Sequence, residues 1–146
     1  MTTTNPDTVA PVRSAPAALP SPSSLRAVAQ TAASRGEPLV VMTTLAGCPF
    51  CEIVRNNYLA PLRRAGTVHA VQLDIRDRSS TLQGFAGEIS NPADMVERWK
   101  ARFAPTVLFF GPDGRELAER LVGVAVPDFF GAYLDNRLEE ARQKLR

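Results

Sequence analysis

The 146-residue sequence has only two cysteines and one histidine, so it lacks the four Cys and His ligands of an ordinary structural zinc site. No stretch approaches the roughly 18 to 20 apolar residues of a membrane-spanning helix. Its 17 basic and 15 acidic residues are mixed along the chain and form no basic face, which argues against nucleic-acid binding. Because 45% of the residues are hydrophobic, we expect one packed domain that folds without a metal or a disulfide scaffold.

The first 24 residues also lack the apolar core of a secretory signal, because their best run, residues 15–19, is broken by Pro16. The chain as given therefore predicts a cytoplasmic protein; the alternative is a periplasmic protein whose export signal has been removed. The same segment contains five prolines among Thr, Ser and Ala, so it buries too little apolar surface to offset its ordering entropy. We predict a disordered tail over residues 1–24 and one domain over residues 25–146.

The two cysteines lie three residues apart, in Cys48-Pro49-Phe50-Cys51. An apolar run over residues 39–45 precedes them and predicts a strand buried on both faces, because its apolar residues do not alternate with polar ones. A helix starting here would have Cys48 at its capping position and Pro49 at the first helical position, which tolerates a missing N–H. The Cys48 sulfur would then lie beside unpaired N–H groups and the positive end of the helix dipole, which favour the thiolate.

Cys51 would follow one turn later on the same helix face. Disulfide exchange needs an accessible attacking thiolate and a second thiol close enough to resolve the mixed disulfide, and this spacing supplies both. We expect an intermediate pKa for the Cys48 thiol, because the side chain of Phe50 cannot donate a hydrogen bond to the sulfur. Glu52, Arg55 and Arg64, on the following helix, are expected to be solvated; the alternative is that one of them tunes the electric field at the cysteines.

The rest of the chain alternates between helical and strand patterns. Residues 76–91 are polar and contain glycine, which predicts an exposed excursion, and the turn signal in residues 111–114 predicts an antiparallel hairpin. This order predicts an α/β fold with one mixed sheet covered by helices on both faces, its first two strands parallel. The predicted helices cover residues 25–34, 48 to an interruption or bend at Pro61, 93–102 and 127–144, and the predicted strands cover residues 39–45, 68–75, 106–110 and 119–124.

Two of these helices have apolar faces that we expect to point inward. In the helix over residues 93–102 and just after it, the inward residues are Met95, Val96, Trp99 and Phe103. In the last helix they are Phe129, Phe130, Tyr133, Leu134 and Leu138.

Three features, in this order, resemble the thioredoxin superfamily. They are the apolar strand that ends in the cysteine motif, the segment Phe103-Ala104-Pro105-Thr106 that opens the next apolar strand, and the Pro-Asp-Gly hairpin followed by Val122-Gly123. The resemblance covers roughly residues 38–140 and implies the thioredoxin fold, a central mixed sheet of about four strands flanked by helices. Within the superfamily, the Leu59-Ala60-Pro61 helix end and the excursion before the third helix resemble bacterial thioredoxin-like proteins linked to sulfur-compound oxidation and protein-thiol reduction.

The resemblance also implies roles for residues around the cysteines. It implies a cis bond that lays Pro105 against the cysteine pair and presents the Ala104 backbone to an extended substrate; the sequence by itself indicates only that proline suits the first residue of a strand. Pro49 and Phe50 are further candidate substrate-binding residues, and Phe50 is either an exposed contact or a ring packed over the helix. The motif differs from the Trp-Cys-Gly-Pro-Cys of thioredoxin, whose buried acid aligns with Met42 here.

We predict a monomeric thiol–disulfide oxidoreductase in which Cys48 attacks a protein disulfide and Cys51 expels the product thiol. The cysteine pair is itself the redox group, so we expect no cofactor and no metal. Its partners would be protein thiols or disulfides and an unidentified redox partner that recharges the pair, and the direction of electron flow depends on the reduction potential. The alternative is a metal-binding or delivery module in which the same pair holds Cu(I), since thiolates select soft ions.

Overall fold

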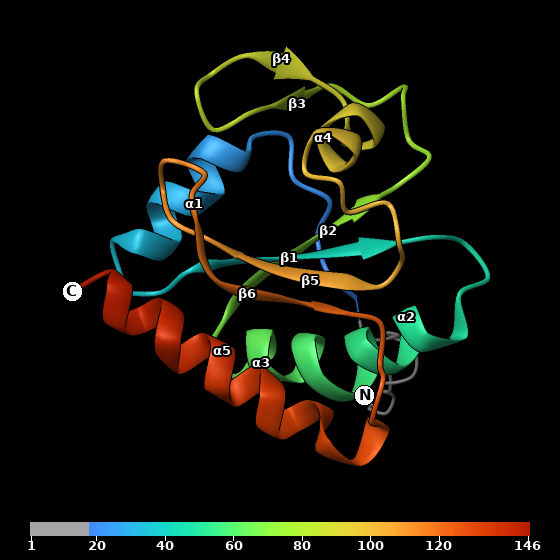
Figure 1. The fold of residues 1–146 in the computed structure, drawn as a ribbon. Helices are drawn as coiled ribbons and strands as arrows, with labels where there is room; N and C mark the ends of the chain where they lie inside the picture. The colour runs from blue at the N-terminus through green and yellow to red at the C-terminus, as the bar shows by residue number, and fades with distance from the viewer. Residues whose placement is uncertain (1–17) are drawn as a thin grey trace, which may run out of the picture.

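Strand β1 (Leu39–Thr44) lies inside a four-stranded sheet in the computed structural model, which describes residues 18–146 (Figure 1). The strand order is β2-β1-β5-β6, with β2 (His69–Asp74) parallel to β1 and β5 (Thr106–Phe110) antiparallel to it. Strand β6 (Glu116–Val122) is antiparallel to β5 and forms one edge. All six residues of β1 are buried, which confirms the prediction from its unbroken apolar run.

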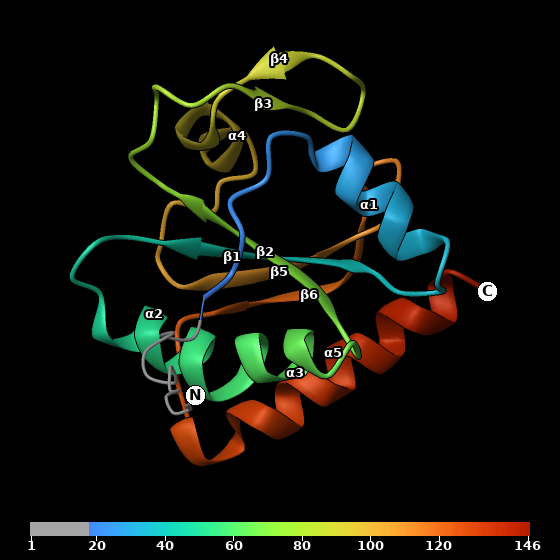
Figure 2. The same cartoon turned by 180° about the vertical axis from the view of Figure 1, so that it is seen from behind.

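Helices cover both faces of the sheet, as predicted (Figure 1, Figure 2). On one face lie α2 (Pro49–Val54), a π-helical turn (Arg55–Leu59) and α3 (Ala60–Arg64), which follow one another without a break, and α5 (Phe130–Lys144) lies beside them. The core on this face contains these buried residues, among others: Val40, Met42, Cys51, Val54, Leu59, Val107, Phe109, Phe130, Leu134 and Leu138. Cys51 is thus part of the hydrophobic core.

The other face is covered by α1 (Leu25–Ala33), α4 (Pro92–Arg98) and a small hairpin of β3 (Leu82–Gln83) and β4 (Ile89–Ser90) (Figure 2). This hairpin lies within the predicted excursion, and its Leu82 is fully buried. The core here contains, among others, Leu25, Ala29, Leu39, Val41, Leu73, Met95, Val96, Leu108 and Phe110. Within residues 18–146, no helix is long and apolar enough to cross a membrane.

Residues 18–24 do not fit the predicted disordered tail. The Leu19 side chain is only 5% exposed and packs into the core that contains Cys51. The Pro20 carbonyl accepts a hydrogen bond from the Gln72 N–H of β2 at 2.9 Å, so the segment covers part of an otherwise open sheet edge. Ser24 is the N-cap of α1, and its side chain accepts a hydrogen bond from the Ala27 N–H. The remainder of the predicted tail, residues 1–17, lies outside the described residues.

The predicted interruption at Pro61 is replaced by a π-helical turn. The Ala60 N–H bonds to the Arg55 carbonyl five residues earlier, and the helix then continues through Pro61 to Arg64. Proline has no N–H and its ring crowds the carbonyl of the preceding turn, so a wider turn accommodates it.

Three residues that were predicted to point inward are exposed instead: Phe103, Phe129 and Tyr133. Helix α4 ends at Arg98, so Phe103 lies beyond it and is 62% exposed, whereas Trp99 packs against the core as predicted, with its ring centroid 4.7 Å from that of Phe110. A 3-10 turn, Pro127–Phe129, precedes α5, and Phe129 and Tyr133 are also exposed. Strand β6 begins at Glu116 instead of the predicted residue 119. The additional residues Leu117 and Ala118 are buried, and the exposed Glu116 and Glu119 on either side of them are tolerated because β6 is an edge strand.

Candidate active site

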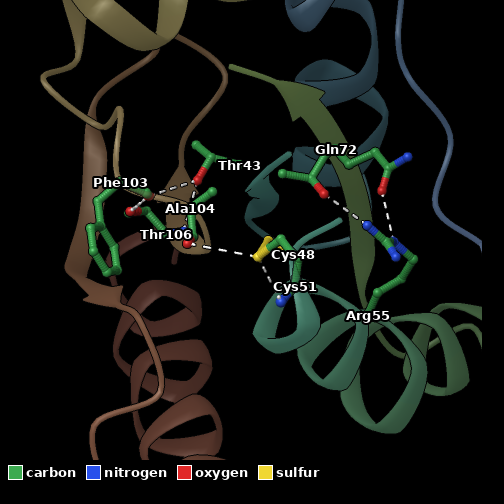
Figure 3. Close-up of a disulfide and its surroundings, with 9 residues drawn as sticks. Thr43, Cys48, Cys51, Arg55, Gln72, Phe103, Ala104 and Thr106 are labelled. Atoms are coloured by element: carbon green, nitrogen blue, oxygen red, sulfur yellow. Dashed lines mark hydrogen bonds between the residues drawn. A yellow bond between two sulfur atoms is a disulfide. The ribbon is translucent and has the colours of Figure 1, made fainter. Parts of the chain in front are cut away.

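The cysteine motif occupies the turn from β1 into α2. After β1 the chain turns through Gly47, whose φ of +75° lies in the left-handed region that glycine adopts without strain. Cys48 is the N-cap of α2 in an extended conformation and Pro49 is the first helical residue, as predicted. A disulfide joins Cys48 to Cys51, with 5.3 Å between their Cα atoms (Figure 3).

The two sulfurs differ in their access to solvent. Cys51 is 0% exposed, whereas Cys48 is partly exposed. The Cys51 backbone N–H donates a hydrogen bond to the Cys48 Sγ at 3.1 Å. This N–H is one of the groups at a helix start that have no partner within the helix, so the fold directs a donor at the accessible sulfur.

The loop before β5 lies against the accessible sulfur. The Ala104–Pro105 bond is cis, as the resemblance implied, and the Ala104 carbonyl oxygen lies 3.8 Å from the Cys48 Sγ (Figure 3). The disulfide has no proton to share, but a reduced Cys48 thiol could donate to this oxygen. Pro105 is buried and Ala104 is half-buried.

Thr43 anchors this loop from the centre of the sheet. Its hydroxyl donates to the Phe103 carbonyl at 3.1 Å and accepts from the Thr106 N–H at 2.8 Å (Figure 3). The Thr106 hydroxyl donates to the same Phe103 carbonyl at 2.5 Å. Both threonine side chains are buried, so these hydrogen bonds satisfy backbone groups that water does not reach.

An open apolar hollow of about 350 Å³ lies beside the loop, lined by Phe50, Phe103, Ala104, Pro105, Val122 and Val124, among others. Phe50 is 52% exposed, so the structure agrees with the exposed alternative for this ring. Pro49 is exposed next to it. Single exposed apolar side chains are ordinary, but several around one hollow are typical of a surface that binds a partner.

The other side of the cysteine turn is polar. The Arg55 Nε–H donates to the Gln72 Oε1 at 2.9 Å, and its Nη2 donates to the Thr44 Oγ1 at 2.8 Å (Figure 3). Arg55 is half-buried and hydrogen-bonded instead of fully solvated as predicted, whereas Glu52 and Arg64 are exposed as expected. No sequence motif marks Thr43, Thr44 or Gln72, so none of them was among the predicted site residues.

Met42, which the resemblance aligns with the buried acid of thioredoxin, is fully buried, and its register partner on β2 is Gln72. Within the described part of the chain, residues 18–146, no group of three or more His, Cys, Asp and Glu is placed to hold a metal ion. The cysteine pair provides the only soft thiolate ligands of the sequence, because it contains no other cysteine.

Two shifted carboxyl groups lie after the end of β2, outside the cysteine turn. The hydroxyl and backbone N–H of Ser80, followed by the N–H of Ser79, lower the pKa of Asp77 to about 2. The backbone N–H of Glu88 itself and the guanidinium of Arg98 hold the pKa of Glu88 below its ordinary value. Both residues are half-buried in the segment between β2 and α4 and lie away from the cysteines, so their shifts concern local loop structure.

A comparison with known families matches the sequence profile of the thioredoxin-like domain to residues 25–138. No curated protein matches in a sequence search. Among solved structures, Fasciola hepatica thioredoxin has a TM-score of 0.56 and 14% identity, with 84% of this chain and 99% of that chain covered. Thioredoxin O2 from Arabidopsis thaliana in the oxidized state has a TM-score of 0.53 and 17% identity, with 83% and 96% covered.

Mitochondrial thioredoxin 3 from Saccharomyces cerevisiae, in its oxidized form, also has a TM-score of 0.53, with 13% identity and 84% and 94% covered. At these identities the structural similarity shows a shared fold. The finer resemblance to proteins linked to sulfur-compound oxidation stays a prediction. Because the family profile spans most of the sequence and the sheet order, helices and cis proline agree with it, the chain belongs to the thioredoxin-like domain family.

Proposed function

We propose that this chain is a thiol–disulfide oxidoreductase that reduces or exchanges protein disulfides, with Cys48 as the attacking residue and Cys51 as the resolving residue. A thioredoxin-like domain with a paired Cys48 and Cys51 supports thiol–disulfide oxidoreductase chemistry in general. The observation that carries the proposal is the asymmetry of the pair: one sulfur is partly exposed at the start of a helix and the other is buried one turn behind it.

The proposed reaction starts from the reduced pair. The Cys48 thiolate attacks one sulfur of a substrate disulfide; a Cys48–substrate bond forms, the substrate S–S bond breaks, and the departing sulfur takes a proton from water. The Cys51 thiol then loses its proton and attacks the Cys48 sulfur, which expels the second substrate thiolate and forms the Cys48–Cys51 disulfide. The substrate gains two electrons from the pair and two protons, one from water and one from the Cys51 thiol.

Helix geometry supports Cys48 as the attacking residue. The Cys51 N–H and the other free N–H groups of the first turn stabilise negative charge on the Cys48 sulfur. Cys51 has no access to an external disulfide, but it lies within bonding distance of Cys48.

The proposed substrate is an extended protein segment bound along the proline loop. The Ala104 backbone lies next to the Cys48 sulfur and can pair with the backbone of such a segment, while Pro49, Phe50 and Pro105 offer apolar contacts. A hollow of about 350 Å³ with mostly apolar lining suits side chains of a polypeptide.

The same proposal includes the partners and the compartment. The pair needs no further cofactor, and an unidentified redox partner returns it to its starting state. The chain acts as a monomer in the cytoplasm, or in the periplasm if an export signal has been removed from it. The relative potentials of the pair and its partner set the direction of flow.

A trapping experiment tests the assignment of the two cysteines. The reduced Cys51→Ser variant is mixed with a peptide dimer that is linked by one disulfide, and the products are weighed by intact mass spectrometry. We expect one peptide to stay bound through Cys48, because nothing resolves the mixed disulfide. The wild-type chain should instead release two peptide thiols and form its internal disulfide.

Cys48→Ser is the matched control, because it retains the buried Cys51 and should form no adduct. A Cys51→Ser variant that gains no peptide would contradict the proposal. If that variant also loses Cu(I) binding that the wild-type chain shows, the result favours the metal-delivery alternative.

A further inference from the structure

Arg55 differs from the other half-buried arginines in what its guanidinium binds. Arg120 pairs with Glu116 at 2.6 Å, Arg137 with Glu119 at 3.5 Å, and Arg142 with Glu37 at 2.9 Å. Among residues 18–146, Arg55 has no carboxylate within the 4.0 Å of an ion pair, and its two partners, Gln72 and Thr44, are neutral. Its positive charge is therefore held in place without being cancelled by a direct contact.

Arg55 lies on the same continuous helix as the cysteine pair. Arg55 follows Cys51 by one helical turn, and its N–H donates to the Cys51 carbonyl. Its side chain spans from the helix to the end of β1, four residues before Cys48, and to β2 (Figure 3). Residues four apart on a helix lie on one face, so the side chains of Cys51 and Arg55 leave the helix on the same side.

The other charged or titratable residues on the helix and strands that Arg55 joins include Glu52 on α2, Tyr58 on the π-helical turn, and His69 and Asp74 at the two ends of β2. Glu52 is exposed, Asp74 accepts the Arg76 N–H at 2.8 Å, and the Tyr58 ring packs against Phe130. None of them forms an ion pair with Arg55 among the described residues.

We propose that Arg55 is a positioning residue whose fixed positive charge favours the reduced cysteine pair over the disulfide. This inference rests on the proposed redox function. The disulfide carries no charge, whereas the reduced pair carries a thiolate at Cys48, so a nearby cation stabilises only the reduced form. Because the guanidinium is half-buried, salt screens it less than it screens a surface charge.

The equilibrium with glutathione measures this preference. Two glutathione molecules give two electrons to the Cys48–Cys51 disulfide and become glutathione disulfide. Of their two protons, one stays on Cys51 and one goes to solvent, which leaves the Cys48 thiolate. The fraction of reduced protein at each glutathione ratio, read after acid quenching and alkylation by mass spectrometry, gives the equilibrium constant.

Arg55→Met removes the charge and keeps a long side chain. We expect the equilibrium constant for reduction of the pair to fall about three- to tenfold, which is about 15 to 30 mV toward a more reducing potential. The pH at which Cys48 alkylation reaches half its maximal rate should rise by about 0.5 to 1 unit. Arg55→Gln should behave like Arg55→Met, and Arg55→Lys, which keeps the charge, should stay within about threefold of wild type.

Arg64→Met is the matched control. Arg64 is exposed, lies on the same continuous helix and has no ion pair among residues 18–146. It lies 13 residues beyond Cys51, roughly 20 Å along the helix, where solvent and salt screen its charge from the sulfurs. We expect both measurements on this variant to match wild type.

The outcomes separate this inference from the proposed function. If glutathione cannot cycle the wild-type pair, the proposed function fails. If the wild-type pair cycles and the neutral Arg55 variants match Arg64→Met, the inference about Arg55 is overturned while the proposed function stands. Failure of both neutral variants to fold, judged by thermal unfolding, would also overturn it, in favour of a purely structural role.

Discussion

The two sides of the disulfide contrast in chemistry. On one side, the loop of Ala104 and Pro105 borders an open apolar hollow. On the other side, Arg55 is bound to Thr44 and Gln72 in a half-buried polar contact. We therefore expect contact with a partner to depend on the residues of the apolar side and the reactivity of the Cys48 sulfur to depend on those of the polar side. Substitutions on one side should then change one property without the other.

The largest effect should come from replacing Cys48, because its sulfur lies between the apolar side and the polar side of the disulfide. We expect Cys48→Ser to slow exchange with the disulfide-linked peptide dimer by more than about a thousandfold, because the attacking sulfur is gone. Stopped-flow measurement of released peptide thiol checks this. Cys51→Ser also lacks the disulfide but should retain the first step, so equal loss in both variants would contradict separate roles for the two sulfurs.

Removing the anchor of the proline loop should have the next largest effect. Thr43→Val keeps the side-chain shape but leaves the Thr106 N–H without its acceptor in a buried place. We expect a loss of about 1 to 3 kcal/mol in the free energy of unfolding, measured by urea denaturation. Peptide exchange should also slow, because the Ala104 backbone is less firmly placed next to Cys48.

Thr31→Val is a suitable comparison for Thr43→Val. Thr31 is exposed on α1, and its hydroxyl makes one hydrogen bond to the Ala27 carbonyl. This substitution should change the free energy of unfolding by no more than about 0.5 kcal/mol. Equal effects of the two substitutions would show that Thr43 has no special anchoring role.

A smaller effect should follow from replacing an exposed ring of the open side. We expect Phe103→Ser to raise the KM for the peptide dimer about three- to tenfold, since an apolar contact of about 1 kcal/mol is lost. The rate with glutathione disulfide, a small substrate that does not need the hollow, should change little. Steady-state kinetics with both substrates would measure this difference.

Ile89→Ser provides the matched control for Phe103→Ser. Ile89 is 72% exposed on β4, on the opposite face of the sheet, and is similarly apolar. It should leave the KM for the peptide unchanged. An equal rise for both variants would mean that general surface hydrophobicity, and not the hollow beside Pro105, governs peptide binding.

The smallest effect should come from Asp77, which belongs to neither side. Its pKa of about 2 lies below the ordinary value of 3.8, so its ionised form contributes stability above about pH 4, and this contribution is lost as the pH falls toward 2. Asp77→Asn should flatten the dependence of unfolding on pH in that range and leave glutathione exchange unchanged. Urea denaturation at several pH values between 2 and 5 would measure it.

Much of the fold could be predicted because its signals are local. The unbroken apolar run of β1, the turn signal at residues 111–114 and the proline at the start of α2 each act through neighbouring residues. The packing of Leu19 could not be predicted, because its neighbours in the core are distant in sequence and its own segment is rich in proline. Phe129 and Tyr133 were predicted to point inward because helical spacing does not show which face the sheet covers.

The candidate site also combines features that are visible in the sequence with contacts that only the fold creates. The spacing of Cys48 and Cys51 within one helical turn is visible in the sequence, as is a proline at the start of a strand. The hydrogen bonds of Thr43 join residues about 60 positions apart, and Arg55 reaches Gln72 over 17 positions. Threonine, arginine and glutamine are common residues, so only the folded sheet shows that these contacts surround the disulfide.

The burial of Cys51 has a consequence for how long a partner would stay attached. A substrate joined to Cys48 would be set free by a sulfur that already belongs to the chain and that bulk solvent does not reach. That step would be first order, with a rate independent of the concentration of surrounding thiols. The lifetime of the covalent complex would then be set within the chain itself, by the motion that brings the Cys51 sulfur onto the Cys48 sulfur.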